Sequence, residues 1–206
     1  MTTAFQYVFD YAETLSINKR RVIGTTITRD NTVRSVNRFG QTWRFEVKLP
    51  DGIAWSEARP YIELMETLDR NTVGTVQINN AGYNTWFTAY QGNAANSAAI
   101  TASWTQGAST ITLTGGQAAS GFNFKAGDII QLGTTGRVYS VTANVATGTN
   151  TVPVHRPIID TSGTGTLRVG PAVTWSVLCT EFPSWTIFSR DQVSWSGPFI
   201  FYENMV

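Results

Sequence analysis

The sequence has few of the residues that most often carry out chemistry. Its 206 residues include one cysteine, Cys179, and one histidine, His155. A single cysteine excludes an intrachain disulfide, so folding does not depend on an oxidising compartment. A histidine-based metal site needs further ligands nearby, and no nucleophile elbow such as G-x-S-x-G is present for a catalytic triad. We therefore expect no catalytic residues, no bound metal and no cofactor, and we predict that the protein is not an enzyme.

Charge is also scarce. Charged residues make up 14% of the chain and the formal net charge is +1, whereas an average soluble domain is about 25% charged. Low charge suggests that neighbouring molecules cover part of the surface, and the near-neutral balance does not favour nucleic acid or an anionic membrane as a partner. No apolar stretch approaches the roughly 18 residues of a membrane helix, and the first residues do not form a signal-peptide pattern. We expect no membrane insertion and folding in a cytoplasm.

What the sequence does have is aromatic residues and glycine, with 7 Trp, 7 Tyr, 11 Phe and 18 Gly. This composition favours short strands joined by turns. The clearest strand is predicted at 41–49 (QTWRFEVKL), where apolar and polar residues alternate with a period of two. Further strands are predicted at 21–28, 32–38, 76–78, 83–90, 173–179, 185–188 and 194–202.

One helix is predicted, over 56–70. Ala58, Tyr61, Met65 and Leu68 fall at helical spacing there. Ser56 is the expected N-cap, and Pro60 is tolerable because it lies near the first turn.

The middle of the chain differs in composition from its two ends. A small, polar linker is expected at 91–99, followed by short strand candidates at 109–114, 128–132, 137–145, 151–154 and 165–169. Five short strands with Gly-rich turns predict a small closed barrel. From residue 173 onward the sequence is again rich in aromatic residues that alternate with polar ones. We predict one domain built from 1–98 plus 171–206, and a second, inserted domain at 99–170.

The segment from Lys19 to Lys48 is rich in basic residues: it contains eight of them, and its only acidic residues are Asp30 and Glu46. Three alternatives are compatible with this pattern: a mixed, solvated surface, a surface that binds nucleic acid, and a protein interface. Of the two binding alternatives we favour the protein interface, because no aromatic–basic motif of a nucleic-acid module is present.

Four segments of the middle region resemble a module of phage tail proteins. These are 107–113 (GASTITL), 124–132 (FKAGDIIQL), 137–142 (RVYSVT) and 152–158 (VPVHRPI). In that module a K-A-G-D-hydrophobic strand is followed, after a tight turn, by a V-Y-x-V/I-T strand. The chain is thus similar to the bacteriophage distal tail proteins, and the flanking regions match that family in the order and length of their elements.

The resemblance implies a mainly β fold, in which a ring-forming β-barrel or sandwich domain with one helix is interrupted by a small barrel of the OB type. It also implies a structural role: a ring, expected to be hexameric, that joins the distal end of the tail tube to the tail hub or baseplate. The inserted barrels would point outward and could anchor side fibres. The expected location is the virion tail tip, after assembly in the host cytoplasm, and the family has no catalytic residues to carry over.

Two sets of contact residues follow as hypotheses. The interface between subunits, or with the tube, is expected to use edge strands and the basic hairpin: Arg34, Arg38, Trp43, Arg44, Phe45, Trp195, Phe199 and Phe201. The alternative function is a carbohydrate-binding module that contacts host glycans through the inserted barrel. Its candidates are Trp104, Phe122, Phe124 and Tyr139. An enzyme with distant paired carboxylates is the least favoured alternative.

Overall fold

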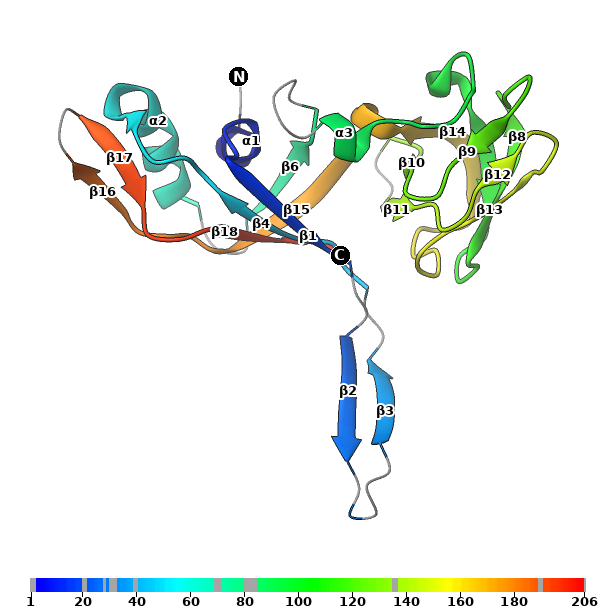
Figure 1. Ribbon diagram of the computed structural model, residues 1–206, viewed down its shortest axis with the longest axis horizontal. Coiled ribbons are helices and arrows are strands. Elements are labelled where there is room, and N and C mark those ends of the chain that lie inside the picture. Colours follow the sequence, from blue (N-terminus) through cyan, green and yellow to red (C-terminus); the bar gives the residue numbers. More distant parts are fainter. Residues whose placement is uncertain are drawn as a thin grey trace.

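The structure is a computed structural model that describes residues 3–19, 22–27, 29, 33–38, 41–68, 72–79, 85–134, 137–188 and 191–205. Antiparallel strands dominate it, so the predicted mainly β fold is confirmed (Figure 1). The described helices are α1 (Ala4–Asp10), α2 (Trp55–Glu66) and α3 (Thr85–Thr88), with short 3₁₀ turns at Ser97–Ala99 and Gly170–Ala172.

The first large sheet takes strands from both ends of the chain. Its order is β1 (Thr14–Asn18), β4 (Arg44–Lys48), β18 (Phe199–Glu203), β15 (Thr174–Glu181) and β6 (Val73–Gln77). The strand predicted at 41–49 is β4, and its apolar–polar alternation arises because every second side chain is buried in the core. Phe45 and Val47 are fully buried, and they lie opposite Phe201 and Phe199 of β18.

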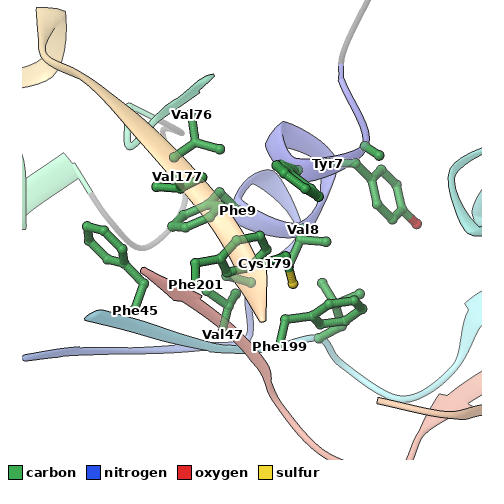
Figure 2. Packing of buried hydrophobic residues seen from close by; sticks show 14 of the residues in the cluster. Tyr7, Val8, Phe9, Phe45, Val47, Val76, Val177, Cys179, Phe199 and Phe201 are labelled. Atoms are coloured by element: carbon green, nitrogen blue, oxygen red, sulfur yellow. The ribbon is translucent and has the colours of Figure 1, made fainter. Parts of the chain in front are cut away.

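Helix α1, which the sequence analysis did not predict, packs on this sheet. Phe5, Val8 and Phe9 of α1 are buried, and the Phe9 ring meets the rings of Phe45 and Phe201 at 5.7 and 5.1 Å (Figure 2). The Thr3 hydroxyl caps the helix by accepting from the Gln6 N–H. Seven residues are too few to show a helical period in the sequence. A helix this short is not stable alone, so its packing on the sheet stabilises it.

Helix α2 confirms the predicted helix, with a corrected start. It begins at Trp55, and its N-cap is Ala54, which has no side chain able to cap, so Ser56 is not the N-cap. Ala58, Ile62 and Met65 form the buried face. The earlier start also places Pro60 as the sixth residue of the helix, beyond the first turn, so the expectation that it lies near the first turn is wrong. Its missing N–H leaves the Ser56 carbonyl without the usual i→i−4 donor. The helix ends at Glu66, with Thr67 as its C-cap, so the predicted end at residue 70 is wrong.

Three strand predictions are wrong. The strand expected over 137–145 is two strands in different sheets, β11 (Val138–Ser140) and β12 (Val145–Ala146). Residues 85–88 form helix α3, where the sequence analysis expected a strand over 83–90, and Thr88 donates its hydroxyl to the Ile78 carbonyl at 2.8 Å. The strand expected at 194–202 is two strands in different sheets, β17 (Gln192–Trp195) and β18. Pro198 lies in the turn between them, where its ring and missing N–H prevent one continuous ladder.

The middle of the chain forms a six-stranded sheet. Its order is β11 (Val138–Ser140), β10 (Ile129–Leu132), β14 (Gly163–Val169), β7 (Thr101–Trp104), β8 (Thr110–Gly115) and β13 (Thr151–Pro153). The outermost strands meet through a bridge between Val141 and Val154, so the sheet closes as a barrel. The small pair β9 (Phe122–Phe124) and β12 (Val145–Ala146) accompanies it. Strand β7 was missed, because residues 101–104 have only one short apolar–polar alternation.

The barrel has a core of its own, yet it also contributes to the first. Ile111, Phe124, Tyr139 and Leu167 belong to the barrel core. Ile129 and Val138 of the barrel strands instead pack with the core of the five-stranded sheet. The division into 1–98 plus 171–206 and 99–170 therefore stays a prediction as far as independently folding domains are concerned.

Two smaller sheets complete the chain. Strands β16 (Trp185–Phe188), β17 and β5 (Ile53–Ala54) form a three-stranded sheet beside α2. Strands β2 (Val22–Ile27) and β3 (Val33–Arg38) pair as an antiparallel hairpin, as predicted, and Figure 1 shows that it extends away from both large sheets.

Candidate interaction surfaces

Most aromatic side chains predicted to contact a neighbouring subunit are inside the protein. Trp43, Phe45, Phe199 and Phe201 are at most 1% exposed, and Trp195 is 7% exposed. Strands β4 and β18 are also internal strands of their sheet, paired on both sides. Neither their side chains nor their backbones are free to bind a partner, so this part of the interface hypothesis is incorrect. The alternating aromatic residues belong to the core here. A strand that faces the core and a strand that faces a partner both place an apolar side chain at every second residue, so the sequence does not distinguish them.

The basic candidates are placed differently. Arg44 is partly exposed, and its guanidinium pairs with Glu46 on the same strand at 3.0 Å. Arg34 and Arg38 lie on β3 of the hairpin, and their side chains are outside the described part of the structure. A contact role for Arg34 and Arg38 stays a prediction.

A buried polar cluster joins the barrel to the five-stranded sheet. Arg156, which follows β13, donates to both carboxylate oxygens of Glu203 on β18, at 2.6 and 2.7 Å. Both side chains are 2% exposed. The Val138 carbonyl accepts from Arg156 and also from the Trp43 indole, each at 3.0 Å. Trp43 is therefore a structural residue at this junction.

The two residues that could do chemistry are held in inactive forms. His155 accepts a hydrogen bond from the Ser140 N–H at 3.0 Å, and burial, with help from the nearby Arg156 and Lys19 charges, lowers its pKa to about 3. Burial raises the pKa of the Cys179 thiol to about 12. At neutral pH His155 is therefore neutral but, with a pKa so far below 7, a very weak base, and Cys179 is a protonated thiol instead of the nucleophilic thiolate.

Of the four barrel aromatic residues proposed for glycan contact, two are buried and two are partly exposed. Tyr139 and Phe124 are fully buried, and the Tyr139 hydroxyl donates to Asp160 at 2.6 Å. A direct glycan contact is incorrect for these two. Phe122 and Trp104 are partly exposed. The Trp104 ring lies over Gly163 and Gly165 of β14, where added Cβ atoms would be 3.4 and 3.5 Å from it.

An exposed apolar edge that the sequence analysis did not single out lies at β16. This is the outermost strand of its sheet, and Ile187 and Phe188 on it are 48% and 42% exposed. Consecutive residues of a strand point to opposite faces, so both faces of β16 are apolar. The sequence carries this signal in Trp185, Ile187 and Phe188, three apolar residues in a strand of four that do not follow one buried face.

A groove adjoins this edge strand. It has a volume of about 400 Å³ and lies between the end of α2 and the segment that leads into β16. Its apolar lining includes Met65, Leu68, Phe182, Trp185 and Trp195. The Trp185 indole donates to Glu66 at 3.0 Å, which fixes one wall.

One edge of the five-stranded sheet, by contrast, is protected. Strand β6 ends its sheet, but the side-chain amide of Gln6 from α1 bonds both backbone groups of Gln77, at 2.8 and 2.9 Å. This pair of bonds imitates a neighbouring strand and blunts the edge of β6. The contrast marks β16 as the more open edge.

Neither a metal centre nor a membrane helix is found in the described residues. Nowhere in these ranges do three His, Cys, Asp or Glu side chains gather as a metal site would require. The helices within the described ranges are too short or too polar to cross a membrane.

Comparison with known proteins adds no assignment. No protein-family model matches the chain, and no curated protein matches it at a significant level.

Proposed function

We propose that this protein is a non-enzymatic structural subunit of a phage tail tip or baseplate, which assembles with copies of itself into a ring. The observation that carries this proposal is the exposed apolar edge strand β16, with Ile187 and Phe188 about half exposed. A long-lived soluble monomer normally blunts such an edge with charge, proline or a cover, because an open edge invites pairing with another chain. No charged residue stands on β16.

Strand addition is the mode of assembly that fits this edge. Strand β16 of one copy adds to an outer strand of the next copy, and backbone hydrogen bonds supply the affinity. We expect β1 to be the acceptor, because it is the outermost strand at the other end of the five-stranded sheet from the blunted β6. Two different edges then meet in each contact, which is a heterologous interface that closes into a ring when the rotation permits.

The groove beside β16 supplies side-chain specificity. With its volume of about 400 Å³ it accommodates one or two apolar side chains of the incoming copy. The resemblance described above further suggests the tail tube and the hub or baseplate as the partners of the two ring faces, with side fibres held on the outside. It also suggests a location in the virion, after assembly in the bacterial cytoplasm.

The test is the assembly state of the purified chain. We expect light scattering and negative-stain imaging to show a ring of about six subunits. The substitutions Ile187→Lys and Phe188→Lys should each give folded monomers with an unchanged circular-dichroism spectrum, because both side chains are exposed in the single chain. Thr112→Lys is the matched control, since Thr112 is exposed on β8, which is paired on both sides.

Two results would contradict the proposal. One is a wild-type chain that stays monomeric at high micromolar concentration, both alone and with tail tube protein added as a template. The other is a ring that forms equally well in both lysine variants.

A second candidate function is glycan binding by the barrel, and the partly exposed Trp104 favours it. A flat indole supported on Gly163 and Gly165 has the form of a platform on which a sugar ring stacks. If this function is present, a glycan array should give a signal that Trp104→Ala abolishes and that Phe122→Ala reduces. An array without signal for the wild-type protein would remove this candidate.

A further inference from the structure

A polar cavity of about 380 Å³ lies where the barrel meets the five-stranded sheet. It is lined from the barrel side by Gln131, Thr134, Arg137, Val138 and Arg168, and from the sheet side by Thr75, Thr174, Ser176 and Glu203. The elements that meet here are β10, β11 and β14 of the barrel and β6, β15 and β18 of the sheet. Segments distant in sequence therefore build the cavity together.

The lining residues define a floor and a rim. Gln131, Val138 and Glu203 are buried, whereas Thr75 and Thr134 are exposed. Arg137, Arg168 and Ser176 are intermediate. A small molecule can therefore enter from solvent and reach the two arginines before it meets the floor.

The charge of the cavity is positive. Glu203 is the one acidic residue in the lining, and Arg156 holds both its carboxylate oxygens at 2.6 and 2.7 Å from outside the cavity. The charges of Arg137 and Arg168 are not offset in this way, since neither forms an ion pair with any described residue. The nearest described carboxylate to Arg137 is Asp160, which accepts from the Arg137 backbone N–H at 2.9 and 3.2 Å and not from its guanidinium. Two guanidinium groups without an ion-pair partner among the described residues therefore line one polar space.

The hydrogen-bonding capacity of these arginines is also largely unused. The Arg137 Nε is buried and has no hydrogen-bond partner among the residues that the structure describes. Arg168 donates to the Thr174 hydroxyl at a long 3.3 Å. A guanidinium has five N–H donors in a planar fork, which matches the oxygens of a carboxylate or phosphate.

The rest of the lining selects against an apolar ligand. The described lining contains no aromatic ring, so sugar stacking does not contribute. Its hydroxyl groups come from Thr75, Thr134, Thr174 and Ser176, which suit a ligand that carries hydroxyls of its own. Gln131 is already engaged with Thr174, donating to its carbonyl at 2.9 Å and accepting from its N–H at 3.1 Å. That amide therefore ties the barrel wall of the cavity to the sheet wall.

We propose that this cavity binds the oxyanion, carboxylate or phosphoryl, of a small hydroxylated molecule, with Arg137 and Arg168 as its two charged ligands. The inference depends on the cavity alone and holds whether or not the chain assembles into a ring. The junction position has a consequence, because a bound anion would bridge barrel and sheet and stabilise their contact.

The test is calorimetric titration of the full chain with four probes: inorganic phosphate, glucose 6-phosphate, glucuronate and glucose. We expect saturable binding of an anionic probe with one site per chain, and no binding of glucose. Arg137→Gln and Arg168→Gln should each weaken that binding about tenfold or more, because each removes a charge-assisted contact. Arg59→Gln, which removes an exposed charge on α2 outside the cavity, should leave it unchanged.

The probes distinguish the source of the oxyanion. Binding of phosphate and glucose 6-phosphate without glucuronate assigns a phosphoryl group, and binding of glucuronate without phosphate assigns a sugar acid. The proposal is overturned if no anionic probe binds at millimolar concentration, if glucose binds as well as the anions, or if Arg59→Gln weakens binding as much as the cavity variants. Should Arg168→Gln fail to fold by circular dichroism, Arg168→Lys keeps the charge without the fork and should show intermediate binding.

Discussion

At the scale of single residues, two groups that look reactive in the sequence serve as neutral parts of the structure. His155 lies between the barrel and the sheet, where the cationic side chains of Arg156 and Lys19 are near it. Lys19 reaches the same place, donating to the Ser140 hydroxyl at 2.6 Å and standing 5.1 Å from the centre of the Trp43 ring. A protonated imidazole would add a third positive charge to this partly buried cluster.

The depressed pKa of His155 predicts how stability depends on pH. Its pKa is about 6.5 in the unfolded chain and about 3 in the folded chain, so between these values only the unfolded state takes up the proton. Stability from this group is therefore complete above about pH 6.5 and falls as the pH drops toward 3. We expect urea unfolding to show a loss of about 1–2 kcal/mol between about pH 7 and pH 5, allowing for partial solvent exposure.

The control for this prediction is His155→Asn. The Asn Oδ1 takes the place of the imidazole Nδ1, so it still accepts from the Ser140 N–H but does not titrate, and the variant should lack this part of the pH dependence. Wild-type and variant curves with the same dependence would show that another group is responsible.

At the scale of elements, α1 is held in place by its contact with β6. A Cβ added at Gly74 of β6 would fall 2.2 Å from the Phe5 ring of α1, and Phe5 is only 2% exposed. The Phe5 ring also packs edge-on against Phe201 at 5.4 Å, so it has little room to move. The absence of a side chain at residue 74 is what lets helix and strand approach this closely.

The prediction is that Gly74→Ala lowers the free energy of unfolding by about 1–3 kcal/mol, the usual cost of overpacking a core. Denaturant unfolding measures it. Phe5→Leu in the same chain should recover part of the loss, because it frees the space of the ring. Gly197→Ala, where an added Cβ meets nothing within 4 Å, should change stability by less than about 0.5 kcal/mol. Equal effects of Gly74→Ala and Gly197→Ala would contradict this packing account.

At the scale of the whole molecule, the barrel and the five-stranded sheet share contacts that couple them. Val138 packs in the sheet's core, and Arg156 of the barrel is paired with Glu203 of the sheet at full burial. We therefore predict one cooperative thermal transition for the wild-type chain by calorimetry. Two well-separated transitions would show instead that the inserted segment unfolds as an independent domain.

The same contact gives the coupling its mutational test. Glu203→Gln leaves the Arg156 charge buried and unpaired, which should cost about 3–5 kcal/mol and separate the barrel and sheet transitions. Arg44→Gln, which breaks a partly exposed pair with Glu46, should cost less than about 1 kcal/mol. A loss for Glu203→Gln no larger than for Arg44→Gln would mean that the buried pair does not couple the two parts.

The sequence by itself determined the local patterns of this protein. The period of two at 44–48, the apolar stripe of α2 and the short strands between glycines each follow from a few neighbouring residues, so the mainly β class was predictable. The scarcity of cysteine, histidine and charge likewise pointed away from chemistry and toward a structural role, a prediction that the assembly experiment tests.

Only the tertiary structure decided which of these strands are covered. The alternating pattern around Phe45 and Phe201 would be the same in an edge strand and in an internal strand. The sheet topology makes both β4 and β18 internal strands. Helix α1 and strand β7 are too short to show their period, and distant contacts hold both in place. The cavity with Arg137 and Arg168, the Arg156–Glu203 pair and the open edge at β16 all depend on residues far apart in sequence. Local patterns carry no information about which distant segments meet, because long-range packing of the complete chain decides it.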